Sequence, residues 1–268
     1  MNNIKHVVID TLIVLAIFLI PQVVLSGLLL FFENSITFDN YGFIVGLSLT
    51  LSSLFVILIV LLTRHISIKK EFNTKSIRWR LAPKILLAIF AGFFSLNVIA
   101  EFIGFQDVSF GIINILMKDK FGIFAVAFLG PVAEELVFRS ALLGKMLKRG
   151  VNPIYAILIS SFMFAVVHFN PIQIFYAFGV GVMFGVLYVK SKSVLPSCIC
   201  HVLNNTLTVI TFMINGDFAN MTYKEIFGSC GILILITIIA IYLCVKIFLW
   251  YYRQNREESE SLQINNDI

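Results

Sequence analysis

Apolar residues occur along this chain in long unbroken runs rather than in alternation with polar ones. Eight runs have about the length that a helix needs to cross the hydrocarbon core of a bilayer. They cover residues 8–32, 41–63, 82–102, 121–147, 153–169, 172–189, 195–214 and 227–250. Runs of this length fit helices rather than the shorter alternating strands of a barrel. The pattern predicts an all-α fold, a polytopic membrane helix bundle with about eight transmembrane helices.

Composition supports a membrane protein over a soluble one. Hydrophobic residues make up 59% of the 268 positions and charged residues only 13%, whereas soluble domains carry about 25% charged residues. The net charge of +5 does not indicate nucleic acid as a partner, because the basic residues flank the apolar runs. The first run follows Lys5 without a small-residue cleavage site, so we interpret it as a retained helix rather than a signal peptide.

Lysine and arginine also predict the orientation. If alternate loops are grouped, 16 of the 20 basic residues fall on one side, from Lys5 through the basic linker of residues 64–84 to Arg256. The other side holds Lys118, Lys120 and Lys224, and Arg139 lies within a run. Because cytoplasmic loops are enriched in Lys and Arg, we expect both termini to be cytoplasmic and the linker to lie along the cytoplasmic leaflet.

Ionisable residues within membrane spans are costly and are functional candidates for that reason. Here they fall on three spans with spacings of four, so each pair shares a helix face. The pairs are Glu135 with Arg139, Phe164 with His168, and His201 with Asn205, and Glu134 precedes the first pair. Glu134 and His168 lie equally far from the turn near Gly150, which predicts similar depth in the membrane.

His201 is harder to place at that depth. It follows Pro196 by only five residues, so on an ideal helix it would lie nearer the cytoplasm than His168. A deeper or re-entrant turn before Pro196 would bring it level with the others.

A carboxylate and a histidine in a dry cavity can hold and deprotonate a water molecule. Arg139 can keep Glu135 ionised, which leaves Glu134 as the more reactive carboxylate. A second histidine with an amide side chain can donate hydrogen bonds to a developing oxyanion. The set suits hydrolysis of an amide without a covalent intermediate, on a site that we expect to face the cytoplasm.

The same residues resemble the motifs of the CAAX prenyl protease and bacteriocin-processing family. Glu134-Glu135-Leu-Val-Phe-Arg139 resembles its E-E-x-x-x-R motif, Phe164 to His168 its F-x-x-x-H motif, and His201 to Asn205 its H-x-x-x-N motif. The three motifs occur in the family order over residues 121–214. The resemblance implies an intramembrane glutamic endopeptidase whose bacterial members are associated with pheromone or bacteriocin maturation and self-immunity.

The resemblance also implies individual roles. Glu134 would activate the water with the help of His168, His201 and Asn205 would form the oxyanion site, and Arg139 would organise Glu135. The expected substrate is a membrane-associated peptide or protein, and neither a cofactor nor a metal is expected. The chain would divide into N-terminal helices and linker (1–110), a catalytic helix bundle (111–252) and a polar cytoplasmic tail (253–268). We find no signal for an oligomeric state.

Three other functions compete with this one. A zinc hydrolase could use Glu134, His168 and His201 as ligands, although the H-E-x-x-H pattern is absent and the four cysteines read as packing residues. A non-catalytic immunity or scaffold protein could keep the fold and bind a peptide. A proton-coupled transporter could use the same buried groups as a relay, although no interrupted spans mark two matching halves.

Overall fold

The chain folds into a bundle of long apolar helices, as the sequence predicts. The computed structural model describes residues 2–31, 38–63, 66–104, 110–214 and 222–266. Within them, seven helical segments are long and apolar enough to cross a membrane. Six are α1 (Asn2–Phe31), α2 (Phe38–Leu62), α4 (Ala82–Ile103), α10 (Pro171–Ser191), α11 (Leu195–Ile214) and α13 (Cys230–Asn266). The seventh runs from Lys120 to Lys148 through several shorter elements.

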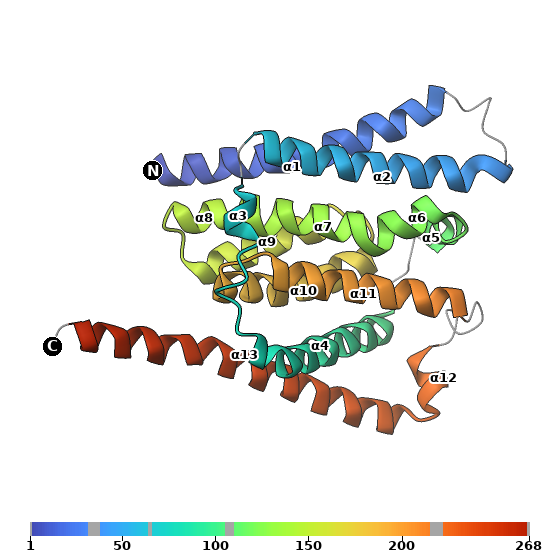
Figure 1. The fold of residues 1–268 in the computed structure, drawn as a ribbon. Helices are drawn as coiled ribbons and strands as arrows, with labels where there is room; N and C mark the ends of the chain where they lie inside the picture. The colour runs from blue at the N-terminus through green and yellow to red at the C-terminus, as the bar shows by residue number, and fades with distance from the viewer. Residues whose placement is uncertain (1, 32–37, 64–65, 105–109, 215–221, 267–268) are drawn as a thin grey trace.

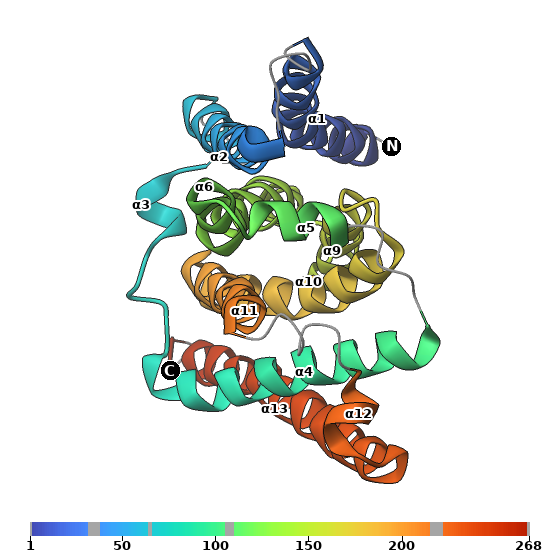
Figure 2. The ribbon, with the colours of Figure 1, turned by 90° about the vertical axis from the view of Figure 1, so that its right-hand side faces the viewer.

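The helices form three layers (Figures 1 and 2). Helices α1 and α2 form the first, and α4 and α13 the third. The middle layer contains the Lys120–Lys148 segment with α9 (Pro153–Val166), α10 and α11. Since α4 packs through Gly92 against Met183 of α10 and Cys244 of α13, helices of the predicted N-terminal unit lie on both sides of the middle layer. The division at residue 110 stays a prediction.

The fifth of the eight predicted spans, residues 153–169, is a shorter helix than expected. Helix α9 has 14 residues, which corresponds to about 21 Å, less than the ~30 Å of a hydrocarbon core. The chain then turns at Phe169, whose φ is 51°, and Pro171 begins α10. His168 therefore lies in the turn between α9 and α10.

Close contact between α9 and α10 depends on glycine. A Cβ atom on Gly181 would lie 3.0 Å from Cβ of Ser161, and one on Gly185 would lie 2.9 Å from Cγ2 of Ile157. The G-x-x-x-G spacing therefore marks a helix contact, which is the use that membrane helices make of it.

The Lys120–Lys148 segment is not one regular α-helix. It comprises α6 (Lys120–Phe124), a π-helical segment η3 (Ala125–Leu129), α7 (Gly130–Glu135), a second π-helical segment η4 (Leu136–Leu143) and α8 (Gly144–Lys148). At the end of η3 the backbone N–H of Gly130 donates to the oxygen of Ala125. Residue 131 is a proline and has no N–H, so the carbonyl of Val126 lacks the next backbone donor.

A short helix closes the turn between α10 and α11. Helix α3 (Ile68–Glu71) lies in the basic linker, but Glu71 is buried in the bundle rather than exposed at a lipid surface. Its backbone oxygen accepts hydrogen bonds from N of Val194 and Oγ of Ser193, and its carboxylate accepts one from Tyr188. Ser193 and Val194 are fully buried. The turn before Pro196 is thus buried beneath α3, while the depth of His201 in a membrane stays a prediction.

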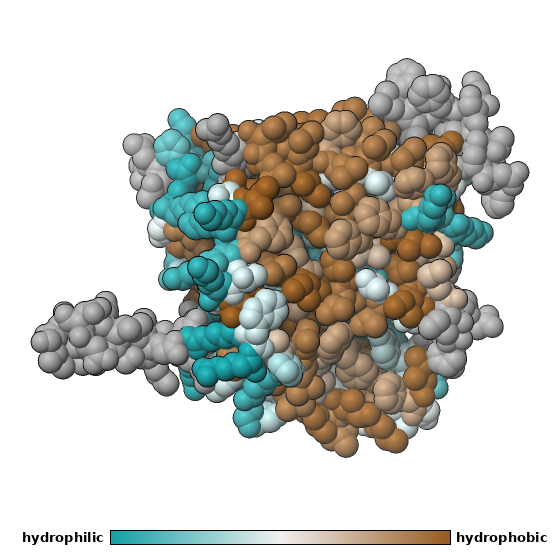
Figure 3. Space-filling model, viewed as in Figure 1, coloured by the Kyte–Doolittle hydropathy of each residue, from teal (hydrophilic) through white to brown (hydrophobic). Residues whose placement is uncertain are grey.

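The two ends of the bundle differ in charge. We call one end of the bundle the basic end (Figure 1). It contains the start of α1, helix α3, the start of α4, helix α8 and the end of α10. Hydrophilic residues gather there, and an apolar band covers the middle (Figure 3). Helices α5 (Phe110–Leu116), α6 and α12 (Tyr223–Phe227) lie at or beside the opposite end, which holds Lys118 between α5 and α6, Lys120 of α6 and Lys224 of α12. Arg64 lies outside the described residues, and α13 continues through the predicted tail to Asn266.

Candidate active site

A cavity of about 420 Å³ lies between the middle layer and helices α1 and α2, and most of the predicted site residues line it. Glu134, His168, His201 and Asn205 all line it. They come from α7, from the turn after α9, and from two successive turns of α11. The predicted match in depth between Glu134 and His168 therefore holds to the extent that one cavity contains both side chains.

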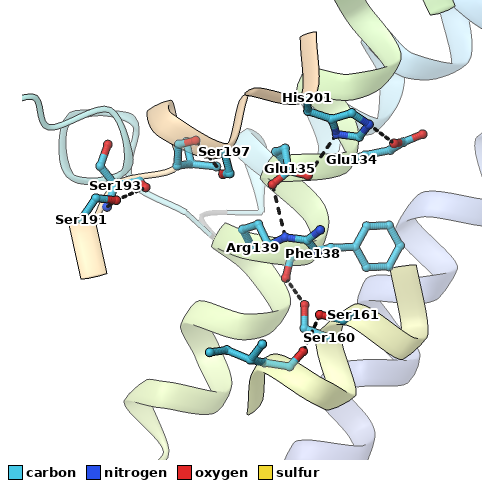
Figure 4. A network of polar contacts seen from close by, with 12 residues as sticks. Glu134, Glu135, Phe138, Arg139, Ser160, Ser161, Ser191, Ser193, Ser197 and His201 are labelled. Carbon is cyan, nitrogen blue, oxygen red and sulfur yellow. Dashed lines mark hydrogen bonds and ion pairs between the residues drawn. The ribbon is translucent and has the colours of Figure 1, made fainter. Parts of the chain in front are cut away.

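Glu135 and Arg139, the other two predicted residues, do not line the cavity. Both side chains have no exposed surface, and Nε of Arg139 lies 3.2 Å from Oε2 of Glu135. Oε1 of Glu135 lies 3.1 Å from Nδ1 of His201. Figure 4 shows the three side chains in a row behind Glu134. The expected ion pair across one helical turn is present, in a part of the protein that is closed to solvent.

Arg139 is an unusual cation because few polar atoms surround it. Among the described residues, its Nη1 and Nη2 atoms have no hydrogen-bond partner. Its guanidinium carbon lies 4.7 Å from the ring centre of Phe164 and 6.0 Å from that of Phe184. Cation–π attraction is strongest where water is absent, so the aromatic rings and Glu135 together hold the charge.

His201 contacts both glutamates. Its Nδ1 faces Glu135, and its Nε2 lies 3.6 Å from Oε2 of Glu134 (Figure 4). The second distance exceeds that of an ordinary hydrogen bond, so His201 and Glu134 lie close together without a direct hydrogen bond. The edge of Phe164 and the ring of Phe184 pack against the imidazole, which restricts its rotation.

The position of His168 fixes its tautomer. Its Nδ1 lies 2.9 Å from the backbone oxygen of Phe164. A carbonyl oxygen only accepts hydrogen bonds, so Nδ1 carries the hydrogen and Nε2 keeps a lone pair in the neutral ring. The i, i+4 spacing of the F-x-x-x-H motif thus presents a basic nitrogen at the cavity.

Asn205 is held by the carbonyl that Pro131 leaves free. Its Nδ2 donates to the oxygen of Val126 at 2.9 Å. Its side-chain oxygen accepts from Nδ2 of Asn204, whose own oxygen accepts from the hydroxyl of Tyr176. The proline before the glutamates is therefore part of the geometry of the site, because it supplies an acceptor for the amide four residues after His201.

Sequence reasoning missed several polar residues of the cavity. The cavity is also lined by Gln22, Gln173, Tyr176 and Thr208, together with Asn204. Their sequence signal is the same as that of the histidines, a polar side chain within an apolar run, but it is weaker because none of them is charged. Within the described part of the chain, no three His, Cys, Asp or Glu side chains are grouped so that they could hold a metal ion.

Comparison with known proteins agrees with the motifs. Residues 117–207 match a family model described as Type II CAAX prenyl endopeptidase Rce1-like. This range contains all six predicted site residues, so the resemblance carried by the three motifs is confirmed over this part of the chain. No solved structure gives a significant match to the chain.

Two curated bacterial proteins are similar to the chain. The Membrane-embedded CAAX protease MroQ of Staphylococcus aureus (strain USA300) is 34% identical over 158 residues, which are 55% of this chain and 63% of that protein. The Putative membrane peptidase YdiL of Bacillus subtilis (strain 168) is 28% identical over 99 residues, which are 37% of this chain and 40% of that protein. The matched parts thus cover less than two thirds of either relative.

Proposed function

We propose that this chain, whose residues 117–207 carry an Rce1-like domain, is a membrane-embedded endopeptidase that uses a glutamate-activated water. The observation that carries the proposal is the contrast between two adjacent carboxylates. Glu134 is 20% exposed and lines the cavity, whereas Glu135 is fully buried against Arg139. Only the first can meet water and a peptide bond, while the second can hold charge and orientation.

Glu134 and His168 would activate the water between them. Both line the same cavity, and the hydrogen bond from Nδ1 of His168 to Phe164 leaves Nε2 as a proton acceptor. A base within reach of the attacking water typically contributes ~10²–10⁴-fold to the rate. The proton taken from the water would pass to the nitrogen of the leaving amine, so that no covalent enzyme intermediate is needed.

His201 and Asn205 would stabilise the negative charge on the carbonyl oxygen. Glu135 can hold a proton on Nδ1 of His201, and a second proton on Nε2 would be donated to the oxyanion. One amide hydrogen of Asn205 is used by Val126, and the other would complete the pair of donors. Donors that are fixed in advance, in a site with little water, are effective in this role.

The proposed substrate is a membrane-associated peptide or protein cut at an internal bond. The residues given as lining the cavity are apolar or neutral polar apart from Glu134, His168 and His201, and no Lys or Arg is among them. A free carboxylate beside the scissile bond would thus meet Glu134 without a compensating cation. Maturation of a peptide pheromone or bacteriocin, or self-immunity, is the biological role that the family resemblance supports.

Cleavage by purified protein tests the proposal. Wild type, Glu134→Gln and Glu101→Gln would be compared on a panel of lipidated and amphipathic peptides, with and without a zinc chelator. Glu101 caps α12 by accepting from N of Tyr223 and serves as the matched control. We expect cleavage by wild type and by Glu101→Gln, loss of ~10²–10⁴-fold in Glu134→Gln, and no effect of the chelator.

Each competing function has its own result in this experiment. Loss of cleavage with chelator would favour the zinc hydrolase. A wild-type cellular phenotype in Glu134→Gln would favour the scaffold or immunity protein. Proton-coupled uptake that fails in Glu134→Gln, with no peptide cut by wild type, would favour the transporter.

A further inference from the structure

One wall of the cavity comes from helices that lie outside the part of the chain matched by the family model. Phe18 and Gln22 of α1 line it, together with Leu49, Ser53 and Val56 of α2. The matched part begins only at residue 117. The wall that these five residues form, which we call the α1–α2 wall, is therefore a part of the cavity to which the three motifs assign no role.

The spacing of the wall residues turns one face of each helix toward the cavity. Phe18 and Gln22 are four residues apart on α1. On α2, Leu49, Ser53 and Val56 follow one another at intervals of four and three residues. Residues at these spacings share a helix face. The wall is thus made of one face from each of two helices, with Gln22 and Ser53 as its two polar positions.

Aromatic packing fixes the α1–α2 wall relative to the candidate site. The ring of Phe18 is buried and lies 5.2 Å from that of Phe138, which in turn lies 5.4 Å from that of Phe164. Phe164 packs edge-on against both histidines that line the cavity. Gln22 follows Phe18 by one helical turn, so its position relative to those histidines is set by this row of rings.

Gln22 lies at an irregular point of α1. The preceding residue, Pro21, is inside the helix and has no N–H, so the helix loses one hydrogen bond there and bends. Figure 1 shows a bend in α1, after which the helix diverges from α2. Gln22 is partly exposed, and its amide makes no hydrogen bond within the described part of the chain. A polar side chain within a membrane span is costly, and here its amide is available to a ligand in the cavity.

Ser53 offers the cavity an acceptor. Its hydroxyl donates to the backbone oxygen of Leu49 at 2.9 Å, so the lone pairs of its oxygen remain to accept hydrogen bonds. The amide of Gln22 has both donors and an acceptor, and so does a peptide unit, with one N–H and one C=O. The α1–α2 wall thus carries the groups that match a peptide backbone, and none of its five side chains is charged.

We infer that the α1–α2 wall binds the main chain of the substrate, with the Gln22 amide hydrogen-bonded to one peptide unit and the Ser53 oxygen accepting from the N–H of a neighbouring one. This inference rests on the proposed function for the identity of the ligand as a peptide. Contacts with main-chain atoms hold an extended segment in place beside Glu134 whatever its side chains are. Gln22 and Ser53 are binding residues in this account, and activation of the water stays with Glu134 and His168.

Peptide binding without cleavage tests the inference. The parent protein is the full chain with Glu134→Gln, and the probes are fluorescent forms of the peptides used for cleavage, with Kd measured by fluorescence anisotropy in detergent. Gln22→Met keeps the length of the side chain but removes the amide, and Ser53→Ala removes the hydroxyl. Ser52→Ala is the matched control, because Ser52 also donates to the oxygen of Leu49 but is not among the residues that line the cavity.

We expect Kd to rise about 3–10-fold in Gln22→Met and in Ser53→Ala, the effect of one lost neutral hydrogen bond, and to stay at the parent value in Ser52→Ala. An unchanged Kd in Gln22→Met overturns the inference, and so does a parent protein that binds none of the peptides. The expected pattern of binding in a chain whose wild type cuts no peptide would support the inference and refute the proposed function. Cleavage by wild type with an unchanged Kd in Gln22→Met would do the reverse.

Backbone substitution in the peptide gives a result that altered helix packing would not produce. Each peptide bond is replaced in turn by an ester, which removes one N–H and keeps the length of the chain. We expect one position at which the ester weakens binding to the parent about 3–10-fold but weakens binding to Gln22→Met no further, as for two groups that interact directly. Equal losses in both proteins at every position overturn the inference.

Discussion

Two sides of α7 contrast sharply although successive residues of the chain form them. Successive residues on a helix point about 100° apart, so Glu134 enters the cavity while Glu135 points to the closed side. The cavity side has apolar and neutral polar residues, the two histidines and one carboxylate, that of Glu134, which is 20% exposed. The closed side holds a carboxylate, a guanidinium and an imidazole with almost no exposed surface. Two adjacent glutamates on one helix can thus have different roles, because the helix turns one toward the cavity, where it can react, and the other toward Arg139 and His201, which it can orient.

Removing the buried carboxylate is the strongest way to break this contrast. Glu135→Gln leaves Arg139 as a buried cation whose terminal nitrogens have no other hydrogen-bond partner among the described residues. Loss of one member of a buried pair costs about 3–5 kcal/mol. We expect Glu135→Gln to lower the thermal unfolding temperature in detergent markedly, while Glu134→Gln unfolds like wild type. Equal stability of the two variants would contradict the division of roles.

Replacing His168 tests whether its Nε2 atom takes part in activating the water in the cavity. His168→Phe keeps a ring against Phe164, which the imidazole contacts edge-on at 5.1 Å, but it removes Nε2. We expect kcat to fall ~10–100-fold, since a hydrogen bond to a charged group contributes ~1.5–3 kcal/mol and each 1.36 kcal/mol is tenfold in rate. Steady-state kinetics checks this, with KM and unfolding temperature as controls. An unchanged kcat would remove His168 from the water-activating pair.

Helix packing behind the site should respond to a single methyl group. Gly181→Ala places a Cβ about 3.0 Å from Cβ of Ser161, whereas a Cβ on Gly231 meets only Oγ of Ser229 at 3.8 Å. Overpacking costs about 1–3 kcal/mol. We expect Gly181→Ala to be destabilised by about this amount and Gly231→Ala to match wild type in the same unfolding assay. The reverse order would show that α9 can move away from α10 without cost.

The smallest effect is expected at the turn that sets the depth of His201. Tyr188→Phe removes the hydrogen bond to Glu71, which measures 3.0 Å, and should cost about 1 kcal/mol. Because Ser193 and Val194 still bond to the backbone of Glu71, we expect most of the activity to remain. Ser193→Ala removes a hydrogen bond to the backbone oxygen of Glu71 and is measured in the same assay. We expect Ser193→Ala to lower kcat more than Tyr188→Phe does, and a larger loss in Tyr188→Phe would contradict this expectation.

Much of the fold and most of the residues of the candidate site can be predicted from the sequence. Hydropathy locates the spans, since lipid demands apolar surface along the whole length of a helix. The motif spacings place Glu135 with Arg139 and bring His168 to the cavity with Glu134, because the period of a helix is fixed. Those residues could be found without a structure, as the ion pair and the shared cavity show.

Other features depend on long-range contacts that no local pattern encodes. The turn before α11 is closed by α3, because Ser193 donates to the backbone oxygen of Glu71, more than one hundred residues earlier in the chain. The π-helical segments around Glu134 change the register without altering the hydropathy of the run. The position of the cavity follows from where side chains leave space between the helices, and hydropathy cannot distinguish a filled region from a hollow one.

The enclosure of the site among packed helices also has a consequence for turnover. Both fragments of a cut chain have to leave the cavity before the next molecule can occupy it. We expect such an enzyme to be inhibited by its own product in a manner that excess substrate relieves, with the slower fragment to leave setting the pace at high substrate concentration.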